Sequence, residues 1–310
     1  MLKLFSPITL GHTRISNRLA LNALPSGCAV PGGFITSDLA RYYLRVAQGG
    51  AGLLVLEPTC ALPPLDRATP HVGLYADAQV SDLHHCIGAL LHTGATVLVM
   101  LDQPLAIAGL SAAENREVGE AFIAAAWRAL AAGAHGIMLS AADDGPFAQL
   151  LSPLRNTRTD EHGGSATNRL RLLRDVVEGI NRWMGHQFVV GVRLNVEEFA
   201  PGGLSLQDAR MIATRLVSAG ARLIEASAET AGDAPVARFP GWRVPLAAGI
   251  KNVVDVPVMV GGLLDDPDLA DGVIREGSAD IVTVGERLRD DPDWPRAARD
   301  TLMRRDSLSR

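Results

Sequence analysis

Three charged residues stand at or near the ends of apolar runs, where a protein could carry out acid/base chemistry or bind an anion. Asp102 and Arg193 each come at the end of such a run, and Asp143 follows another after a few residues. A carboxyl group can transfer protons if burial raises its pKa toward neutrality. A buried arginine seldom lacks a partner. We therefore expect Arg193 to meet an anionic ligand or a carboxylate, and we regard Asp143, together with Asp102, as a candidate acid/base group.

Apolar, β-branched runs alternate with amphipathic stretches along the whole chain, and glycine follows several of these stretches, as at helix C-termini. The sequence predicts strands at residues 18–24, 52–57, 96–101, 136–140, 188–194, 223–227, 256–260 and 280–284. It predicts helices at residues 36–48, 78–93, 113–132, 165–184, 205–219, 244–253, 267–276 and 292–303. Eight strands that alternate with eight helices predict an α/β fold, a single (β/α)8 TIM barrel.

A doubly wound open sheet is the alternative fold, but it would need a glycine-rich turn after the first strand. The first predicted strand leads instead into LPSGCAVPGG at 24–33, which is not GxGxxG. With 310 residues, 47% of them hydrophobic, the chain suits one barrel domain over residues 1–310. Residues 5–17 are expected to form a short hairpin that plugs the bottom of the barrel. Functional residues are expected in the loops after the strands.

Composition excludes several classes of function. A net charge of −5 argues against nucleic acid as a partner, because phosphate binding needs a basic face. The three cysteines show no CxxC spacing, so neither a metal site nor a disulfide framework is indicated. The N-terminus lacks the apolar region of a signal peptide, and no apolar run approaches the roughly 20 residues of a membrane span. We predict a cytoplasmic protein without a membrane segment, acting on a small-molecule substrate.

The stretch at 152–165, SPLRNTRTDEHGGS, is the most specific in the chain. Gly163 and Gly164 can adopt positive φ, and Ser165 can cap the helix that follows. Asp160 and Glu161 place negative charge just ahead of the helix N-terminus, where the helix dipole favours it. The stretch closely resembles a loop of the old yellow enzyme family, which are flavin-dependent NAD(P)H oxidoreductases.

The resemblance covers nearly the whole chain. LFSPITLG at 4–11 and NRLAL at 17–21 resemble the opening of the family, and RYYLRVAQGGAGLLVLE at 41–57 resembles its second βα unit. Residues 252–294 resemble its last two units. The resemblance implies a TIM barrel with FMN at its mouth and NAD(P)H as reductant. It also implies a homo-oligomer, since barrels of this family often form dimers or tetramers.

The family pattern carries over to the expected phosphate end of FMN. Backbone amides after the seventh and eighth strands would bind the phosphate, and an arginine in the fifth strand would contact the flavin. Where the family usually has an arginine beside the last glycine, this chain has Glu286, with an arginine one position later. The residues implied by the resemblance are Arg193, Gly261, Gly262, Gly285 and Arg287.

Positions that usually serve the flavin ring depart from the family pattern. Pro25 replaces a threonine or cysteine after the first strand, Pro58 stands where a backbone N–H usually serves the flavin, and Met100 replaces a glutamine. Proline has no N–H to donate. An unpaired polar group at the ring edge would cost roughly 1–3 kcal/mol. The sequence therefore predicts an altered flavin pocket.

The substrate side departs as well. Counting back from 152, the imidazole pair of the family falls on Ser140 and Asp143, and its proton-donating tyrosine falls on Gly145. Asp143 and its neighbour Asp144 could equally be solvated loop carboxylates. The loop after the third strand is shortened, which leaves a wide mouth or a face for a partner protein. After the sixth strand, Trp242 could line a pocket or pack against the next helix.

Three functions stay open from the sequence. The first is a divergent FMN oxidoreductase of the old yellow enzyme type with an altered flavin and substrate pocket. The second is a flavin-independent barrel enzyme, an isomerase, cyclase or lyase, with Asp143 or Asp102 as base. The third is a non-catalytic barrel that binds a partner.

Overall fold

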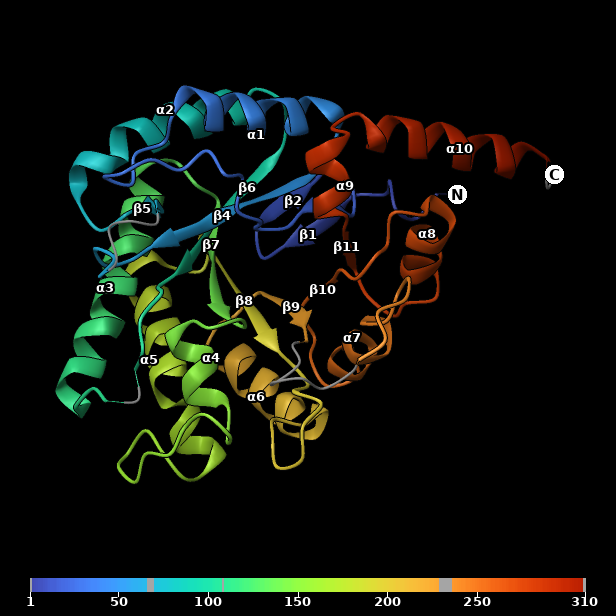
Figure 1. Cartoon of the computed structure of the whole chain (residues 1–310). Helices are drawn as coiled ribbons and strands as arrows, with labels where there is room; N and C mark the ends of the chain where they lie inside the picture. Colours follow the sequence, from blue (N-terminus) through green and yellow to red (C-terminus); the bar gives the residue numbers. More distant parts are fainter. Residues whose placement is uncertain (1, 66–69, 108, 229–235, 309–310) are drawn as a thin grey trace.

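Eight parallel strands form a closed barrel within residues 2–65, 70–107, 109–228 and 236–308, the part of the chain that the computed structural model describes (Figure 1). The strands are β3 (Leu19–Leu21), β4 (Leu53–Cys60), β6 (Thr96–Asp102), β7 (Gly136–Ala141), β8 (Val189–Asn195), β9 (Leu223–Ser227), β10 (Val258–Val260) and β11 (Ile281–Thr283). The barrel closes because β3 pairs in parallel with both β11 and β4. The predicted (β/α)8 fold is confirmed, and the open sheet is excluded.

Each of the eight predicted helices is present on the outside of the barrel (Figure 1). They are α1 (Ser37–Gly49), α2 (Val80–Leu91), α3 (Ala112–Ala131), α5 (Ala166–Met184), α6 (Leu206–Ser218), α7 (Val244–Lys251), α8 (Pro267–Arg275) and α10 (Trp294–Leu308). The helix predicted at 78–93 starts as a 3₁₀ turn, Asp77–Gln79, and the last helix extends to residue 308. In the described part of the chain, no helix is long and apolar enough to cross a membrane.

Three short elements were not predicted. These are β5 (Val72–Gly73), α4 (Pro146–Leu151) and α9 (Gly285–Asp290). Elements of two to six residues are too short to show a hydrophobic period. Both helices lie in loops that follow strands, so they add structure at the mouth of the barrel.

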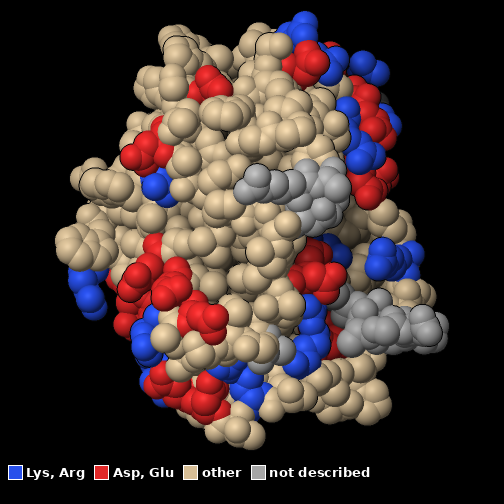
Figure 2. Space-filling model, turned by 60° about the vertical axis from the view of Figure 1, so that its left-hand side comes forward, with Lys and Arg blue, Asp and Glu red and all other residues tan. Residues whose placement is uncertain are grey.

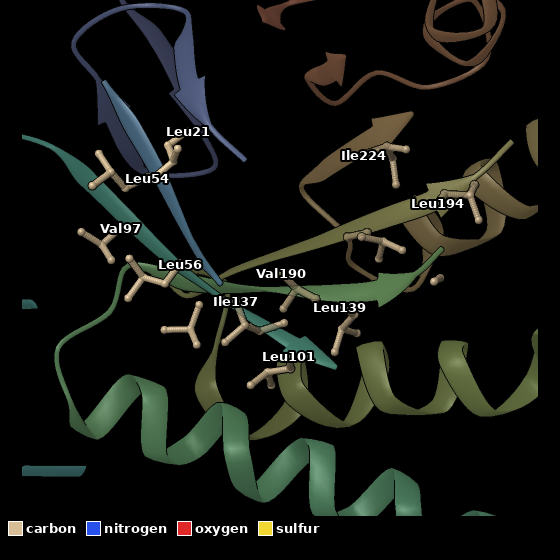
Figure 3. Packing of buried hydrophobic residues seen from close by; sticks show 14 of the residues in the cluster. Leu21, Leu54, Leu56, Val97, Leu101, Ile137, Leu139, Val190, Leu194 and Ile224 are labelled. Carbon is tan, nitrogen blue, oxygen red and sulfur yellow. The ribbon is translucent and has the colours of Figure 1, made fainter. Parts of the chain in front are cut away.

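The apolar residues of the strands form two separate cores. Side chains from all eight strands meet inside the barrel, among them Leu53, Met100, Met138 and Met259. The alternate residues, such as Leu54, Val97, Ile137 and Val190 in Figure 3, point outward and pack under the helices. Because side chains alternate along a strand, each strand is apolar on both faces. The last inward-facing residue of each strand must therefore lie at the mouth.

The N-terminal hairpin closes the opposite end. It consists of β1 (Ile8–Leu10) and β2 (Thr13–Ile15), which pair antiparallel within the segment where a hairpin was expected. Leu10 and Ile15 are fully buried and belong to the inner core. The interior is therefore packed from the hairpin up to the mouth, and the mouth is the open end.

The loop at residues 152–165 is held by its own side chains. The amide nitrogen of Asn156 donates to the carbonyls of Leu150 and His162, at 2.7 and 2.8 Å. Arg158 pairs with Asp160 and also donates to the backbone carbonyl of Ile107 at 3.2 Å and to that of Leu110. The loop is thus tied to Ile107 and Leu110, which follow β6 in the chain.

Acidic and basic side chains are intermixed on the face of the molecule in Figure 2. Several ion pairs in the described part of the chain join exposed neighbours on one helix, such as Arg174 and Asp175, with 2.6 Å between Nη2 and Oδ1. Exposed pairs of this kind contribute only about 0–1 kcal/mol each. The charged groups with larger consequences are those buried at the mouth.

We expect Gly49→Ala to destabilise the protein by about 1–3 kcal/mol, as overpacking does. A Cβ atom at Gly49 would lie 1.7 Å from the carbonyl oxygen of Pro292, which is backbone and cannot yield easily. Gly88→Ala in α2 is the control, because nothing lies within 4 Å of its Cβ position. That change should stabilise by about 0.5–1 kcal/mol through helix propensity. Urea unfolding measures the free energy of unfolding of both variants. Equal changes would contradict the close approach of Gly49 to Pro292.

Arg158→Ala should lower the free energy of unfolding by about 1.5–3 kcal/mol, the usual contribution of hydrogen bonds to a charged group. Hydrogen exchange should also quicken at residues 109–111, because Arg158 no longer ties this segment to the loop. Arg116→Ala is the matched control, since its guanidinium is exposed and lies 3.7 Å from Glu161. It should change stability by less than about 0.5 kcal/mol. If hydrogen exchange at residues 109–111 were unchanged in the Arg158 variant, the hydrogen bonds of Arg158 would not hold this segment.

Candidate active site

Four polar side chains from neighbouring strands lie at one level of the barrel mouth. Leu101 of β6 pairs with Leu139 of β7, so Asp102 and Ser140 follow side by side. Ser140 is opposite Arg193 of β8, and Arg193 is opposite Glu225 of β9. These four residues continue the inward-facing positions of the inner core. The apolar interior therefore ends in a row that contains two carboxyl groups, a hydroxyl and a guanidinium.

Arg193 lies between two carboxylates. Its Nη1 atom is 3.3 Å from Oδ2 of Asp143, and its Nε atom is 3.9 Å from Oε1 of Glu225. The Arg193 side chain is only 11% exposed, whereas that of Asp143 is 51% exposed. The structure thus brings together Arg193 and Asp143, two of the residues singled out in the sequence.

Asp102 is a half-buried acid beside this pair. Its Oδ1 atom accepts from the N–H of Gln103 at 2.8 Å, and the Ser140 hydroxyl also donates to its carboxylate. Burial raises the pKa of Asp102 from 3.8 to about 6, partly offset by the Gln103 N–H. The charge of Asp143 raises this pKa further, and Arg193 and Ser140 lower it. Such a carboxyl group can hold or release a proton near neutral pH.

Gly145 has no side chain, and the carboxyl group of Asp102 occupies the space where one would lie. A Cβ atom at Gly145 would lie 2.4 Å from Oδ1 of Asp102, so any side chain there would displace the carboxyl group. Gly145 also precedes α4, which begins with Pro146. Asp143 has a φ of 59°, a left-handed conformation that costs a non-glycine residue about 1–2 kcal/mol. The turn after β7 is therefore built around the two carboxyl groups.

Glu225 was not identified from the sequence. It is 3% exposed, and its Oε2 atom has no hydrogen-bond partner among the described residues. Burial raises the pKa of Glu225, against the opposing charges of Arg193 and Arg243. The sequence did contain a signal for it. Side chains two residues apart on a strand point to the same face, so Glu225 faces inward like Leu223, just as Asp102 faces inward like Met100.

A cavity of about 420 Å³ opens beside Arg193, over the C-terminal ends of β3, β8, β10 and β11. Five residues predicted for cofactor binding line it, namely Arg193, Gly261, Gly262, Gly285 and Arg287. Asn22, Arg238, Trp242 and Arg243 line it as well, and of these only Trp242 was considered in the sequence. Its volume is within the range of small-molecule sites.

The charged lining of the cavity is mixed. Arg243 stacks on Trp242, with 4.6 Å from the guanidinium carbon to the ring centroid. Its Nη2 atom donates to the carbonyl of Ala228 at 3.1 Å. Arg287 is 3.1 Å from Asp291, which limits its charge toward the cavity. Opposing carboxylates on the lining come from Asp265, Glu286 and Asp290.

Two buried polar atoms on the cavity wall have no hydrogen-bond partner among the described residues. They are Oδ1 of Asn22 and Nε of Arg243, an acceptor and a donor. Buried polar groups in proteins are nearly always paired, so each calls for an explanation. A ligand that carries an anionic group, hydroxyl groups and acceptor atoms, as FMN does, would pair with both and with the arginines. The residues present therefore fit the phosphate and hydroxyl end of FMN.

Three residues predicted near the flavin ring do not line this cavity. Met100 is 1% exposed and lies in the inner core, where it is paired in register with Met138. Pro25 is exposed in the loop after β3. Pro58 lies where β4 and β6 shift register. The structure thus brings together the residues expected to bind the phosphate of FMN, but not the residues expected beside the flavin ring.

Comparison with known proteins places the chain in a family. Residues 102–304 match the NADH:flavin oxidoreductase / NADH oxidase family. The chain is 30% identical to an NADH oxidase of Thermoanaerobacter brockii, over 96% of this chain and 50% of that protein. It is 30% identical to an NADPH dehydrogenase of Halalkalibacterium halodurans, over 96% of this chain and 94% of that protein.

The fold agrees with these matches. The old yellow enzyme homologue of Zymomonas mobilis superposes with a TM-score of 0.80 at 22% identity, over 96% of this chain and 92% of that one. The chain spans half the length of the NADH oxidase and nearly all of the NADPH dehydrogenase. Similarity over nearly its full length confirms the resemblance noted in the sequence: this chain belongs to the NADH:flavin oxidoreductase / NADH oxidase family, the family of the old yellow enzymes.

Proposed function

We propose that this protein is an FMN-dependent oxidoreductase that takes electrons from NAD(P)H and reduces a small molecule, with altered flavin and substrate pockets. The observation that carries the proposal is the cavity beside Arg193, with its glycines and its unpaired Asn22 and Arg243 atoms. The names of the relatives, NADH oxidase and NADPH dehydrogenase, support a nicotinamide nucleotide as the reductant.

Several residues of the cavity would hold FMN. The backbone at Gly262 and Gly285 would receive the phosphate, and Arg243 would add charge. Gly262 has a φ of 116°, a conformation that favours glycine and brings backbone to the cavity wall. Arg193 would meet the flavin beside the row of polar residues. Bound FMN would supply two-electron redox chemistry that amino-acid side chains lack.

The altered part of the proposed site is its substrate side. Ser140 and Asp143 stand where the family pattern has imidazoles, and Gly145 stands where it has a tyrosine. Asp102 adds a second carboxyl group to this side. We infer that the substrate of this protein is bound by a hydroxyl and carboxyl groups, whereas two imidazoles would bind it in the family pattern. A homo-oligomeric state and a cytoplasmic location stay predictions from the sequence.

Flavin-independent proton transfer is the second candidate function. Asp102 and Asp143 belong to the protein itself and lie on either side of Ser140, so their acid/base chemistry needs no flavin. An isomerase, cyclase or lyase would use the same row. A non-catalytic barrel that binds a partner is the third possibility, favoured only by the short segment after β6.

The flavin itself separates these functions. Purified protein should be yellow and release FMN on denaturation, or should take up added FMN with a Kd below about 1 μM, about −8 kcal/mol. Quenching of FMN fluorescence measures the uptake, and NAD(P)H should then bleach the bound flavin under nitrogen. Colourless protein that takes up no FMN would refute the proposal and leave the second and third functions.

Arg193→Lys should weaken FMN binding about tenfold, because lysine offers a point charge in place of a planar fork. Lysine keeps the positive charge beside Glu225, so the variant should still fold, which its melting temperature checks. Arg174→Lys is the matched control, since Arg174 pairs with Asp175 on the surface of α5 and neither residue lines the cavity. Equal FMN affinity in all three proteins would exclude Arg193 from the cofactor site.

A further inference from the structure

We propose that the outer faces of α3 and α5 are the contact surface for a second copy of this chain, centred on Trp127 and Trp183. The inference does not depend on the proposed function, because it concerns the outside of the barrel and no residue beside the cavity. It goes beyond the homo-oligomer expected from the sequence, since it names the surface and the way in which two copies meet.

Two of the four tryptophans of the chain lie on the surface. Trp127 is 56% exposed and Trp183 is 72% exposed, whereas Trp242 and Trp294 are buried. Tryptophan is enriched where proteins contact each other, because one side chain covers a large area. A single exposed apolar residue needs no explanation, but two that lie together indicate an interaction surface.

The packing of α3 against α5 places the two tryptophans side by side. The helices are neighbours on the outside of the barrel and run in the same direction (Figure 1). A Cβ atom at Gly179 of α5 would lie 2.6 Å from the side chain of Ile123 of α3, so these positions are at one level. Trp127 comes one turn after Ile123, on the same side of α3. Trp183 comes one turn after Gly179, which puts both tryptophans at the next level of the seam.

The charged residues around the tryptophans differ in sign along the helices. Glu120 lies two turns before Trp127 on the same face of α3, and Arg182 directly precedes Trp183 on α5. Both charged residues are exposed, and within the described part of the chain neither has an ion-pair partner. Their levels along the helix axes are about 9 Å apart, at 1.5 Å per residue. A patch with one free charge of each sign complements itself when it is turned by 180°.

This self-complementarity favours a second copy over a different partner, which would not require it. A two-fold axis midway between the two levels would set the helices of the two copies antiparallel. Arg182 of one copy would then meet Glu120 of the other, and the symmetry would repeat this pair on the far side of the axis. Between Glu120 and Trp127 on this face lies Ala124, which is small enough to let the copies approach.

The surface is large enough for a specific contact. The helices have 20 and 19 residues. Two such helices about 10 Å apart present a face of roughly 30 by 20 Å. This area is comparable to the about 800 Å² that each partner contributes to a standard interface.

Sedimentation of the purified chain over a range of concentrations tests the proposal. Wild type should sediment as a dimer at micromolar concentration. The double variant Trp127→Ser with Trp183→Ser should raise the dissociation constant by about 100-fold or more, since tryptophans often dominate interface energies. It should keep its melting temperature, because both side chains are exposed. Met303→Ser, at an exposed residue of α10, is the matched control and should leave the dimer unchanged.

A charge swap tests the two-fold arrangement. Glu120→Arg and Arg182→Glu should each weaken the dimer about tenfold, because each places two pairs of like charges across the axis. The protein that carries both changes restores the opposite charges, so its dissociation constant should return to within about threefold of wild type. These positions are exposed, so the single variants should fold even if the serine variant does not.

Tryptophan emission provides a separate readout. Because Trp242 and Trp294 are buried within one copy, a shift to shorter wavelength on association must come from Trp127 and Trp183. The proposal is overturned if wild type is monomeric, if the folded serine variant stays a dimer, or if the charge swap does not restore association. Emission that stays constant while the dimer dissociates on dilution would also exclude these tryptophans from the contact.

Discussion

The charge pair between Arg193 and Glu225 is the interaction on which the mouth of this barrel depends. Both groups lie at the end of an apolar interior, and burying either one alone would cost several kcal/mol. Each therefore requires the other, with Arg243 and Asp143 completing the compensation on either side. Because the pair spans β8 and β9, it fixes the height at which the interior changes from apolar to polar. The cavity begins at that height.

Much of the fold could be predicted from the sequence, since apolar runs alternate with amphipathic stretches and glycine follows several of the predicted helices. β9 spans the predicted residues 223–227, and the other strands differ only at their ends. Strand ends shift because closing the barrel decides which terminal residues still find a partner. The two short helices, α4 and α9, follow from loop geometry and leave no period in the sequence. Their prediction would need the positions of the strands that they follow.

The site was less predictable, because it depends on which residues face inward at one level. The glycines and Arg193 were found through resemblance, and they do line one cavity. Glu225 and Asn22 were missed, although counting every second residue from Leu223 and Ala20 would have reached them. The close approach of Gly145 to Asp102 could not have been found this way, since it joins the end of β6 to the loop after β7. Only the folded chain shows that the carboxyl group of Asp102 lies beside Gly145, where a side chain is absent.

The position of Asp143 links the two halves of the proposed site. Its carboxylate lies against Arg193 in a backbone conformation that costs free energy, so the ion pair offsets a local strain. An anionic ligand that approaches Arg193 must compete with this carboxylate. A ligand that displaces it would separate Asp143 from Arg193. If the ligand is neutral at that point, the ion pair persists and Asp143 continues to raise the pKa of Asp102. The charge of the group that meets Arg193 would therefore modulate, through Asp143, a pKa of Asp102 that burial raises first.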